Sequence, residues 1–224
     1  MFIRNPMPEQ LDPALVAALG TLGTSTLGHM RDHGFPRGLS PVRRPLRFVG
    51  TAVTVRIPHL DSTAVHVAAD SLRPGDVIVV EQNGDENRSC FGGMVSHTAH
   101  ARGAVGAVIE GCINDIDDLD GLGFPVFSRG ISSLTTRIAG IEGAINVPVT
   151  IGGAIINPGD AIMADSDGIA VISPDEAWEI VAKLRAKEER EGPLKLKISA
   201  GDQLSNWTRA REVFEANEVP AVRV

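Results

Sequence analysis

Runs of apolar residues mark three buried strands in the first half of the chain. Residues 47–57 show partial alternation and are rich in β-branched residues, which is typical of a strand. The segment 73–81 contains four apolar residues in succession, and 104–111 is also largely apolar. Successive side chains of a strand point to opposite faces, so an unbroken apolar run predicts a sheet that is covered on both faces.

Helical patterns separate these strands. Residues 62–72 repeat apolar side chains at helical spacing, with Ser62 as the expected N-cap. Residues 94–103 are expected to form a short helix that Gly103 closes. Strands that alternate with helices predict an α/β fold.

The chain after Gly140 has a different pattern. Short apolar segments separated by turn residues predict an all-β region, in which residues 165–168 are expected to form a hairpin turn. Residues 173–191 have the apolar stripe of an amphipathic helix, and Ser173 and Glu176 form a capping box at its start.

A Gly-Pro pair at 192–193 is expected to end that helix before a last helix around residues 203–217. We therefore predict an α/β domain over residues 1–190. A helical C-terminal extension over 191–224 is expected to pack on the same domain or on a neighbouring subunit.

Composition narrows the classes of function. The chain has 224 residues, 43% of them hydrophobic, which is enough to bury a core. A formal charge of −7 provides no basic surface for nucleic acid. The chain shows neither a membrane span nor a secretory signal, so no membrane partner and a cytoplasmic location are expected.

Lysine is absent from residues 1–182. All four lysines lie near the C-terminus, at positions 183, 187, 195 and 197. The predicted core therefore lacks a Schiff-base lysine, a phosphate-loop lysine and a lysine that could anchor pyridoxal phosphate.

Two glycines precede the predicted helix at 94–103. Gly92 and Gly93 would expose backbone N–H groups at a helix N-terminus, where an anion is favoured. The segment lacks the third glycine and the acidic residue of a dinucleotide-binding fingerprint. A tight turn that needs glycine explains the pair equally well.

Carboxylates follow the third predicted strand. Asp115 is nearest to the strand end, where ligands collect in open α/β sheets, and it is the better candidate for a Mg²⁺ or Mn²⁺ ligand. Asp117, Asp118 and Asp120 are expected to face solvent in a short acidic helix or turn.

The histidines and cysteines are expected to have no catalytic role. His97 and His100 share one helix face, but no further pair of ligands accompanies them, so both are interpreted as surface residues. Cys90 and Cys112 have apolar or small neighbours and are expected to be buried thiols.

Seven segments, taken in order, resemble the RraA-like family. They are GTAVTV (50–55), RPGDVIVVE (73–81), FGGMVSHTAHARGAVGAVIEG (91–111), INDIDDL (113–119), PVFSRG (125–130), PVTIGGAIINPGD (148–160) and ADSDGIAVIS (164–173). The family includes 4-hydroxy-4-methyl-2-oxoglutarate aldolases, oxaloacetate decarboxylases and the regulator of ribonuclease activity A. The resemblance implies an α/β/β sandwich similar to swivelling phosphohistidine domains. It also implies a homotrimer or homohexamer with the active site at a subunit interface.

For the aldolases of this family, the resemblance implies a C–C lyase that uses Mg²⁺ or Mn²⁺. A small 2-oxo or hydroxy acid would be held through its carboxylate and keto oxygen, and the metal would stabilise the enolate formed as the bond breaks. The absence of lysine from the core agrees with this route, because imine chemistry needs a lysine.

The resemblance also assigns residues to the site. The substrate loop corresponds to Gly92, Gly93, Met94 and Val95, and the metal-binding aspartate corresponds to Asp115. The family often carries an acidic residue in the glycine loop, where this chain has Gly93 or Met94.

At Asn114 the resemblance implies an arginine that binds substrate. Asparagine cannot make a charged bidentate contact to a carboxylate. Arg88, Arg102 or Arg129 is expected to replace it, and Arg88 is preferred because it lies four residues before the glycine loop. The catalytic group would then be Asp115, Asn114 and Arg88. The alternatives are an oligomer with altered catalysis that regulates another protein by binding it, or a different reaction on a sugar-acid-like substrate.

Overall fold

Four parallel strands form the centre of the first of two compact units. The computed structural model describes residues 1–84 and 87–219, and the chain divides into the units Met1–Val181 and Ala182–Val224. In spatial order the four strands are β3 (Arg47–Pro58), β4 (Asp76–Asn83), β6 (Gly106–Ile113) and β7 (Val126–Ile131).

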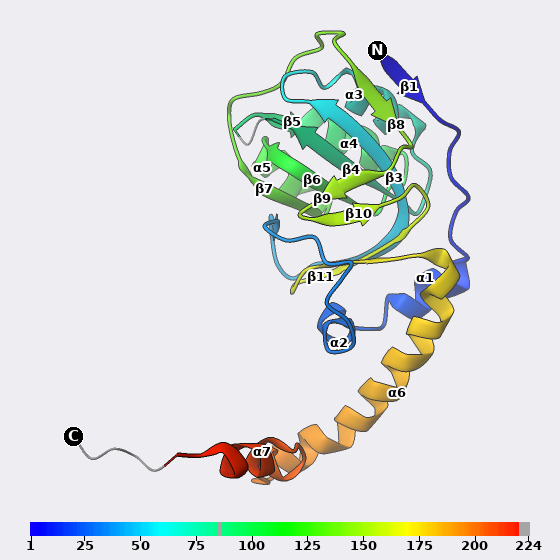
Figure 1. Cartoon of the computed structure of the whole chain (residues 1–224). Helices are drawn as coiled ribbons and strands as arrows, with labels where there is room; N and C mark the ends of the chain where they lie inside the picture. The colour runs from blue at the N-terminus through cyan, green and yellow to red at the C-terminus, as the bar shows by residue number, and fades with distance from the viewer. Residues whose placement is uncertain (85–86, 220–224) are drawn as a thin grey trace, which may run out of the picture. The chain divides into compact units, whose positions relative to one another are not determined.

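Helices cover one face of this sheet and a β-hairpin covers the other. Behind the sheet in Figure 1 lie α3 (Thr63–Ser71), α4 (Gly93–Ala101) and α5 (Ile116–Leu122). In front of it lies the hairpin of β9 (Val149–Ile151) and β10 (Ala154–Ile156). β11 (Ala161–Asp165) pairs antiparallel with β3 and with β12 (Ile169–Ile172), which confirms the predicted turn at 165–168. The arrangement is the predicted α/β/β sandwich.

Coverage on both faces explains the unbroken apolar runs. Val77, Ile78, Val79 and Val80 are all fully buried. Ile78 and Val80 pack in the core on the helical side, and Val77 and Val79 pack in the core on the hairpin side. Each such side chain stabilises the fold by about 1.5–3 kcal/mol relative to an exposed one. The apolar run is therefore a consequence of the sheet's position between two layers.

Three short strands were not expected from the sequence. β1 (Phe2–Arg4) pairs with β8 (Gly143–Ile145), β2 (Ser40–Pro41) pairs with β7, and β5 (Ser89–Phe91) pairs with the end of β6. Runs of two or three residues have no periodicity that could predict them. α1 (Pro13–Leu19) and α2 (Thr24–Gly28) complete the elements that precede β3.

The predicted end of α4 is confirmed. Gly103 has a φ of 82°, a left-handed conformation that favours glycine. Its N–H donates to the carbonyl of His100 at 2.9 Å, and the N–H of Ala104 donates to the carbonyl of Ala99 at 3.0 Å. These two bonds satisfy carbonyls that the helix itself leaves without donors.

The predicted N-cap of α3 is confirmed in position, but its side chain makes no capping hydrogen bond. Ser62 stands at the N-cap position, but its hydroxyl donates to the carbonyl of Arg137 and makes no capping bond to the helix. Asp61 takes this role, because its Oδ1 accepts from the N–H of Thr63 at 2.9 Å. Burial raises the pKa of Asp61, but hydrogen bonds from Thr63 and from the N–H groups of Ile141 and Ala139 outweigh it and lower the pKa to about 2.

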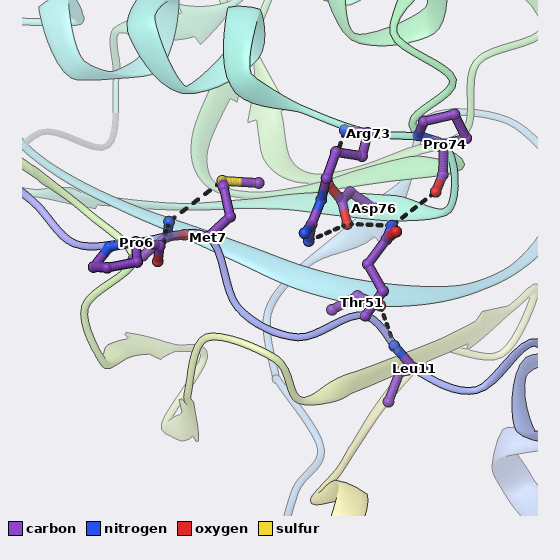
Figure 2. A network of polar contacts seen from close by, with 9 residues as sticks. Pro6, Met7, Leu11, Thr51, Arg73, Pro74 and Asp76 are labelled. Atoms are coloured by element: carbon purple, nitrogen blue, oxygen red, sulfur yellow. Dashed lines mark hydrogen bonds and ion pairs between the residues drawn. The ribbon is translucent and has the colours of Figure 1, made fainter.

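A buried carboxylate fastens the N-terminal segment to the sheet (Figure 2). Asp76 is fully buried at the start of β4, and it accepts hydrogen bonds from the N–H and the guanidinium group of Arg73. Gln10 donates from Nε2 to Asp76 Oδ1 at 3.1 Å and to the carbonyl of Pro74 at 2.8 Å. One side chain therefore joins the N-terminal segment, the turn before β4 and β4 itself.

We predict that Asp76→Ala lowers the free energy of unfolding by about 3–5 kcal/mol, because it leaves the Arg73 guanidinium without its buried partner. Urea-induced unfolding measures the change. The matched control is Asp120→Ala, since Asp120 forms an exposed pair with Arg43 at 3.7 Å and should contribute less than about 1 kcal/mol. Equal losses in the two variants would contradict the structural role of Asp76.

α6 follows the predicted amphipathic helix but extends further. It runs from Pro174 to Ser199, and Glu176 Oε1 accepts from the N–H of Ser173 at 3.3 Å, which is half of the expected capping box. The predicted break at 192–193 is wrong, because Pro193 lies inside the helix. A proline removes one helical hydrogen bond, here to the carbonyl of residue 189. That residue is exposed, so water can supply the missing donor.

The predicted helix at 203–217 is divided. A 3-10 turn (Leu204–Asn206) precedes α7 (Ala210–Asn217), because Thr208 Oγ1 accepts from the N–H of Ala210 at 3.3 Å and starts a new helix there. The boundary between the α/β domain and the C-terminal extension, expected after residue 190, stays a prediction. α6 runs continuously through this position. Within the described ranges, no helix has both the length and the apolar character needed to cross a membrane.

Candidate functional site

The parallel pairing of β5 with β6 brings the glycine loop next to Asp115. Gly92 is the N-cap of α4, which follows β5, and Asp115 is the N-cap of α5, which follows β6. Asp115 Oδ2 accepts a hydrogen bond from the N–H of Gly93 at 2.7 Å. Two segments that lie more than twenty residues apart in sequence therefore meet at one edge of the sheet.

Asp115 adopts an unusual backbone conformation. Its φ of 55° and ψ of 48° place it in the left-handed region, at a cost on the order of 1 kcal/mol for a residue other than glycine. Its side chain makes no capping bond to its own helix. The carboxylate instead lies at the N-terminus of α4, where the helix dipole favours negative charge. Strain of this kind is concentrated at functional sites.

Asn114 has an internal role. Its Oδ1 accepts a hydrogen bond from the hydroxyl of Ser89, and its N–H donates to the carbonyl of Phe91 at 3.1 Å. A Cβ atom on Gly92 would lie 2.8 Å from Cγ of Asn114. The amide of Asn114 thus fills the space beside Gly92 and requires glycine there.

Asp118 is part of this arrangement, although the sequence predicted only a solvent-facing carboxylate. A Cβ atom on Gly93 would lie 2.7 Å from Asp118 Oδ2 and 3.1 Å from Asp115 Oδ2. Asp118 is exposed, as expected, but its carboxylate also stands in front of the glycine loop. The signal that could have found it is the spacing of three residues, which puts Asp115 and Asp118 on one face of a helix.

The amide donors of the loop are already partly used. The N–H of Gly93 bonds to Asp115, so the first turn of α4 leaves the N–H groups of Met94 and Val95. Across residues 1–84 and 87–219, neither of these two groups has a hydrogen-bond partner. They are the orphan donors that a helix N-terminus offers to an anion.

The three candidate arginines lie in different places. Arg88 immediately precedes β5, is half-buried, and donates from Nη1 to the carbonyl of Thr135 at 3.1 Å. Arg102 follows the other end of α4, about 13 Å from the glycine loop along the nine-residue helix. Arg129 forms an ion pair with Glu110. Arg88 is therefore the candidate nearest in the chain to the glycine loop and β5.

Glu110 fixes Arg129 on the hairpin side of the sheet. Its Oε1 accepts from Arg129 Nε at 3.1 Å, and its Oε2 accepts from the N–H of Gly152, between β9 and β10, at 2.6 Å. The glycine loop belongs to the helical side. This pairing removes Arg129 from the set that could compensate for Asn114.

The site suits a hard divalent cation with few protein ligands. Asp115 and Asp118 present carboxylate oxygens at the same place, and both side chains are exposed. The described residues contain no group of three or more histidine, cysteine, aspartate or glutamate side chains placed to hold a metal. Mg²⁺ commonly keeps several waters and uses only one or two carboxylates, so this donor set fits it.

The other candidate side chains are placed as predicted. His97 and His100 are exposed, and His100 contacts the edge of the Phe124 ring with the two centroids 6.3 Å apart. Cys90 and Cys112 are buried, and neither forms a disulfide bond. Burial raises the pKa of Cys90 to about 12, which keeps it as an unreactive thiol.

A family model matches most of the chain. The model is that of the RraA-like family, described as Aldolase/RraA, and it covers residues 18–171. The chain belongs to the RraA-like family. A relative from Halalkalibacterium halodurans, named "Putative 4-hydroxy-4-methyl-2-oxoglutarate aldolase", is 37% identical over 150 residues, which make up 67% of this chain and 71% of that protein.

Solved structures share the RraA-like fold. An uncharacterized protein from Pseudomonas syringae pv. tomato is 29% identical with a TM-score of 0.77, and the match covers 90% of this chain and 96% of that one. RraAS2 from Streptomyces coelicolor is 27% identical with a TM-score of 0.75, covering 87% and 100%. The latter is described as an unusual member of the RNase ES inhibitor RraA protein family. Relatives of this chain therefore carry the names of both aldolases and regulators.

We predict that Gly92→Ala lowers the free energy of unfolding by about 1–3 kcal/mol, because the new Cβ displaces Asn114 and disturbs its bond with Ser89. Thermal unfolding measures this change. Gly121→Ala is the matched control: no atom lies within 4 Å of the new Cβ, and alanine in α5 should stabilise by about 0.5–1 kcal/mol. A G92A protein as stable as G121A would contradict the close packing of the glycine loop.

Proposed function

We propose that this chain is a metal-dependent lyase that cleaves a carbon–carbon bond in a small 2-oxo or hydroxy acid. The observation that carries the proposal is the position of Asp115, whose carboxylate lies 2.7 Å from the Gly93 N–H at the N-terminus of α4. The aldolase name of the H. halodurans relative supports the class of reaction. The proposed cation is Mg²⁺ or Mn²⁺, with Asp115 as its principal ligand.

Each part of the site would have a separate task. Asp115 holds the cation, and the unpaired N–H groups of Met94 and Val95 bind the carboxylate of the substrate. Gly92 and Gly93 have no side chains that would block this approach. The chemistry that Mg²⁺ supplies when bound is stabilisation of the negative charge that develops on substrate oxygens when a 2-oxo acid undergoes aldol cleavage or decarboxylation.

Arg88 would supply the positive charge that Asn114 lacks. Its contact with the Thr135 carbonyl anchors it beside β5, whose first residue, Ser89, donates to Asn114. A guanidinium group in this region would assist the two N–H groups in holding a substrate carboxylate. Asn114 itself would act through its contact with Gly92, as a residue that positions the loop.

We further infer that the working form is a homotrimer or homohexamer with the site at a subunit interface. Large apolar side chains near the site are exposed: Met94 by 79%, Ile131 by 64% and Leu134 by 46%. Their burial against a second copy would remove water from the cation and the substrate. This would strengthen the charge interactions on which the reaction depends.

The decisive test is turnover of oxaloacetate and of 4-hydroxy-2-oxo acids in the presence of Mg²⁺ or Mn²⁺. The release of pyruvate or carbon dioxide measures this turnover. We expect Asp115→Asn to lower kcat at least about a hundredfold, because the amide keeps the shape of the side chain but not its charge. Asp120→Asn, a neutralised carboxylate on the same helix, should leave kcat within about twofold of wild type. Absence of turnover of every such acid by the wild-type chain would overturn the proposal.

A regulatory function is the second candidate. It is favoured by the inward-facing amide of Asn114, which leaves the site without a charged substrate clamp at that position, and by the RNase-inhibitor family to which RraAS2 is assigned. If this function is correct, the purified chain should inhibit an RNase ES-type ribonuclease at stoichiometric concentration, and D115N should inhibit equally well. Turnover without inhibition would exclude it.

A further inference from the structure

The space that a side chain on residue 93 would occupy is already filled by Asp118. A Cβ atom built on Gly93 would lie 2.7 Å from Asp118 Oδ2, closer than real Cβ contacts allow. Gly93 is the first residue of α4 and does not have a positive φ, so its backbone would accept a side chain. The atoms nearest to the built Cβ are those of the Asp118 and Asp115 carboxyl groups, and the exposed Asp118 carboxylate would have to turn aside to admit a side chain there.

Asp115 and Asp118 bring two negative charges to this place. Asp115 Oδ2 lies 3.1 Å from the same built Cβ position, so the two carboxylates converge on one small volume. Within the ranges that the structure describes, neither forms an ion pair with an arginine or lysine. Two carboxylates that share one small volume repel each other, and a cation bound between them would offset that repulsion.

The helix geometry distinguishes Asp118 from the other acids of α5. Asp115 is the N-cap, and Asp118 stands three residues later, on the same face. Asp117 and Asp120 are also exposed, yet neither residue contributes any of the three atoms nearest to the built Cβ position. The acidic character of the segment therefore does not by itself account for the position of Asp118.

We propose that Asp118 is the second carboxylate of the cation site, directly or through a bound water, and that it reaches this site from α5, opposite Gly93. The proposal rests on the cation of the proposed function and specifies how this chain would hold it. Two carboxylates and several waters are a usual environment for Mg²⁺ and Mn²⁺.

Binding of Mn²⁺ by the full chain tests this without any substrate. The signal of free Mn²⁺ in electron paramagnetic resonance gives the Kd of the wild type and of D118A, D117A and D115N. We expect D118A to weaken binding about ten- to a hundredfold. D117A removes the same charge from the same helical turn and should change Kd by less than about twofold. Thermal unfolding verifies that each variant is folded.

A double variant that moves the carboxylate from residue 118 to residue 93 provides a more specific test. In G93D/D118A the space left by Asp118 is vacant and a new carboxylate enters it from α4, so we expect Kd to return to within about threefold of wild type. G93N/D118A has a side chain of the same size without the charge, and its Kd should stay as weak as that of D118A. Restoration by aspartate but not by asparagine would assign the effect to a carboxylate in that one place.

Two results would overturn the proposal: equal Kd values for D118A and D117A, or no gain of G93D/D118A over G93N/D118A. If D115N loses binding while D118A keeps it, the role of Asp118 fails and the proposed lyase stands. If the wild-type chain binds no Mn²⁺ at millimolar concentration, the cation site fails, and the metal-dependent reaction fails with it.

Discussion

Burial of the parallel strands on both faces is the constraint on which the rest of this structure depends. β4 and β6 have apolar side chains above and below the sheet for most of their length, so polar groups concentrate toward the ends of the strands and in the loops that follow them. Parallel strands also require crossover helices, and these helices begin at the same edge. The covered sheet thus fixes the place at which α4 and α5 start and at which Gly93 and Asp115 meet.

Close approach of two helix starts then determines the residue types. A side chain on Gly92 would clash with the Asn114 amide, and the atoms nearest to a side chain on Gly93 would be those of the Asp118 and Asp115 carboxyl groups. The left-handed backbone of Asp115 turns its carboxylate away from its own helix and toward α4. A strained residue, two glycines and two carboxylates are therefore parts of one packing arrangement, and negative charge is held where a helix dipole favours it.

The site also explains how the family scaffold is kept while polar positions differ. Asn114 satisfies Ser89 and packs on Gly92, so its neutral side chain has a structural task that does not depend on substrate. Arg129 is held by Glu110 on the hairpin side, which leaves Arg88 as the candidate for a compensating charge. The fold therefore fixes the positions of Asn114, Arg129 and Arg88. The chemistry of the site depends on which charged side chains lie close to the glycine loop.

The sequence by itself determined what local periodicity and local stereochemistry control: the doubly buried run Val77–Val80, the glycine that ends α4 and the hairpin at 165–168. It also located the glycine loop and Asp115, because loops that follow buried strands gather at one edge. Only the tertiary structure decided that the side chain of Asp61, and not that of Ser62, bonds to the start of α3, that α6 continues through Pro193, and that Asp118 faces Gly93. These features depend on contacts between segments distant in sequence or on water that can bond to the carbonyl of residue 189. Such contacts leave no periodic pattern in the sequence.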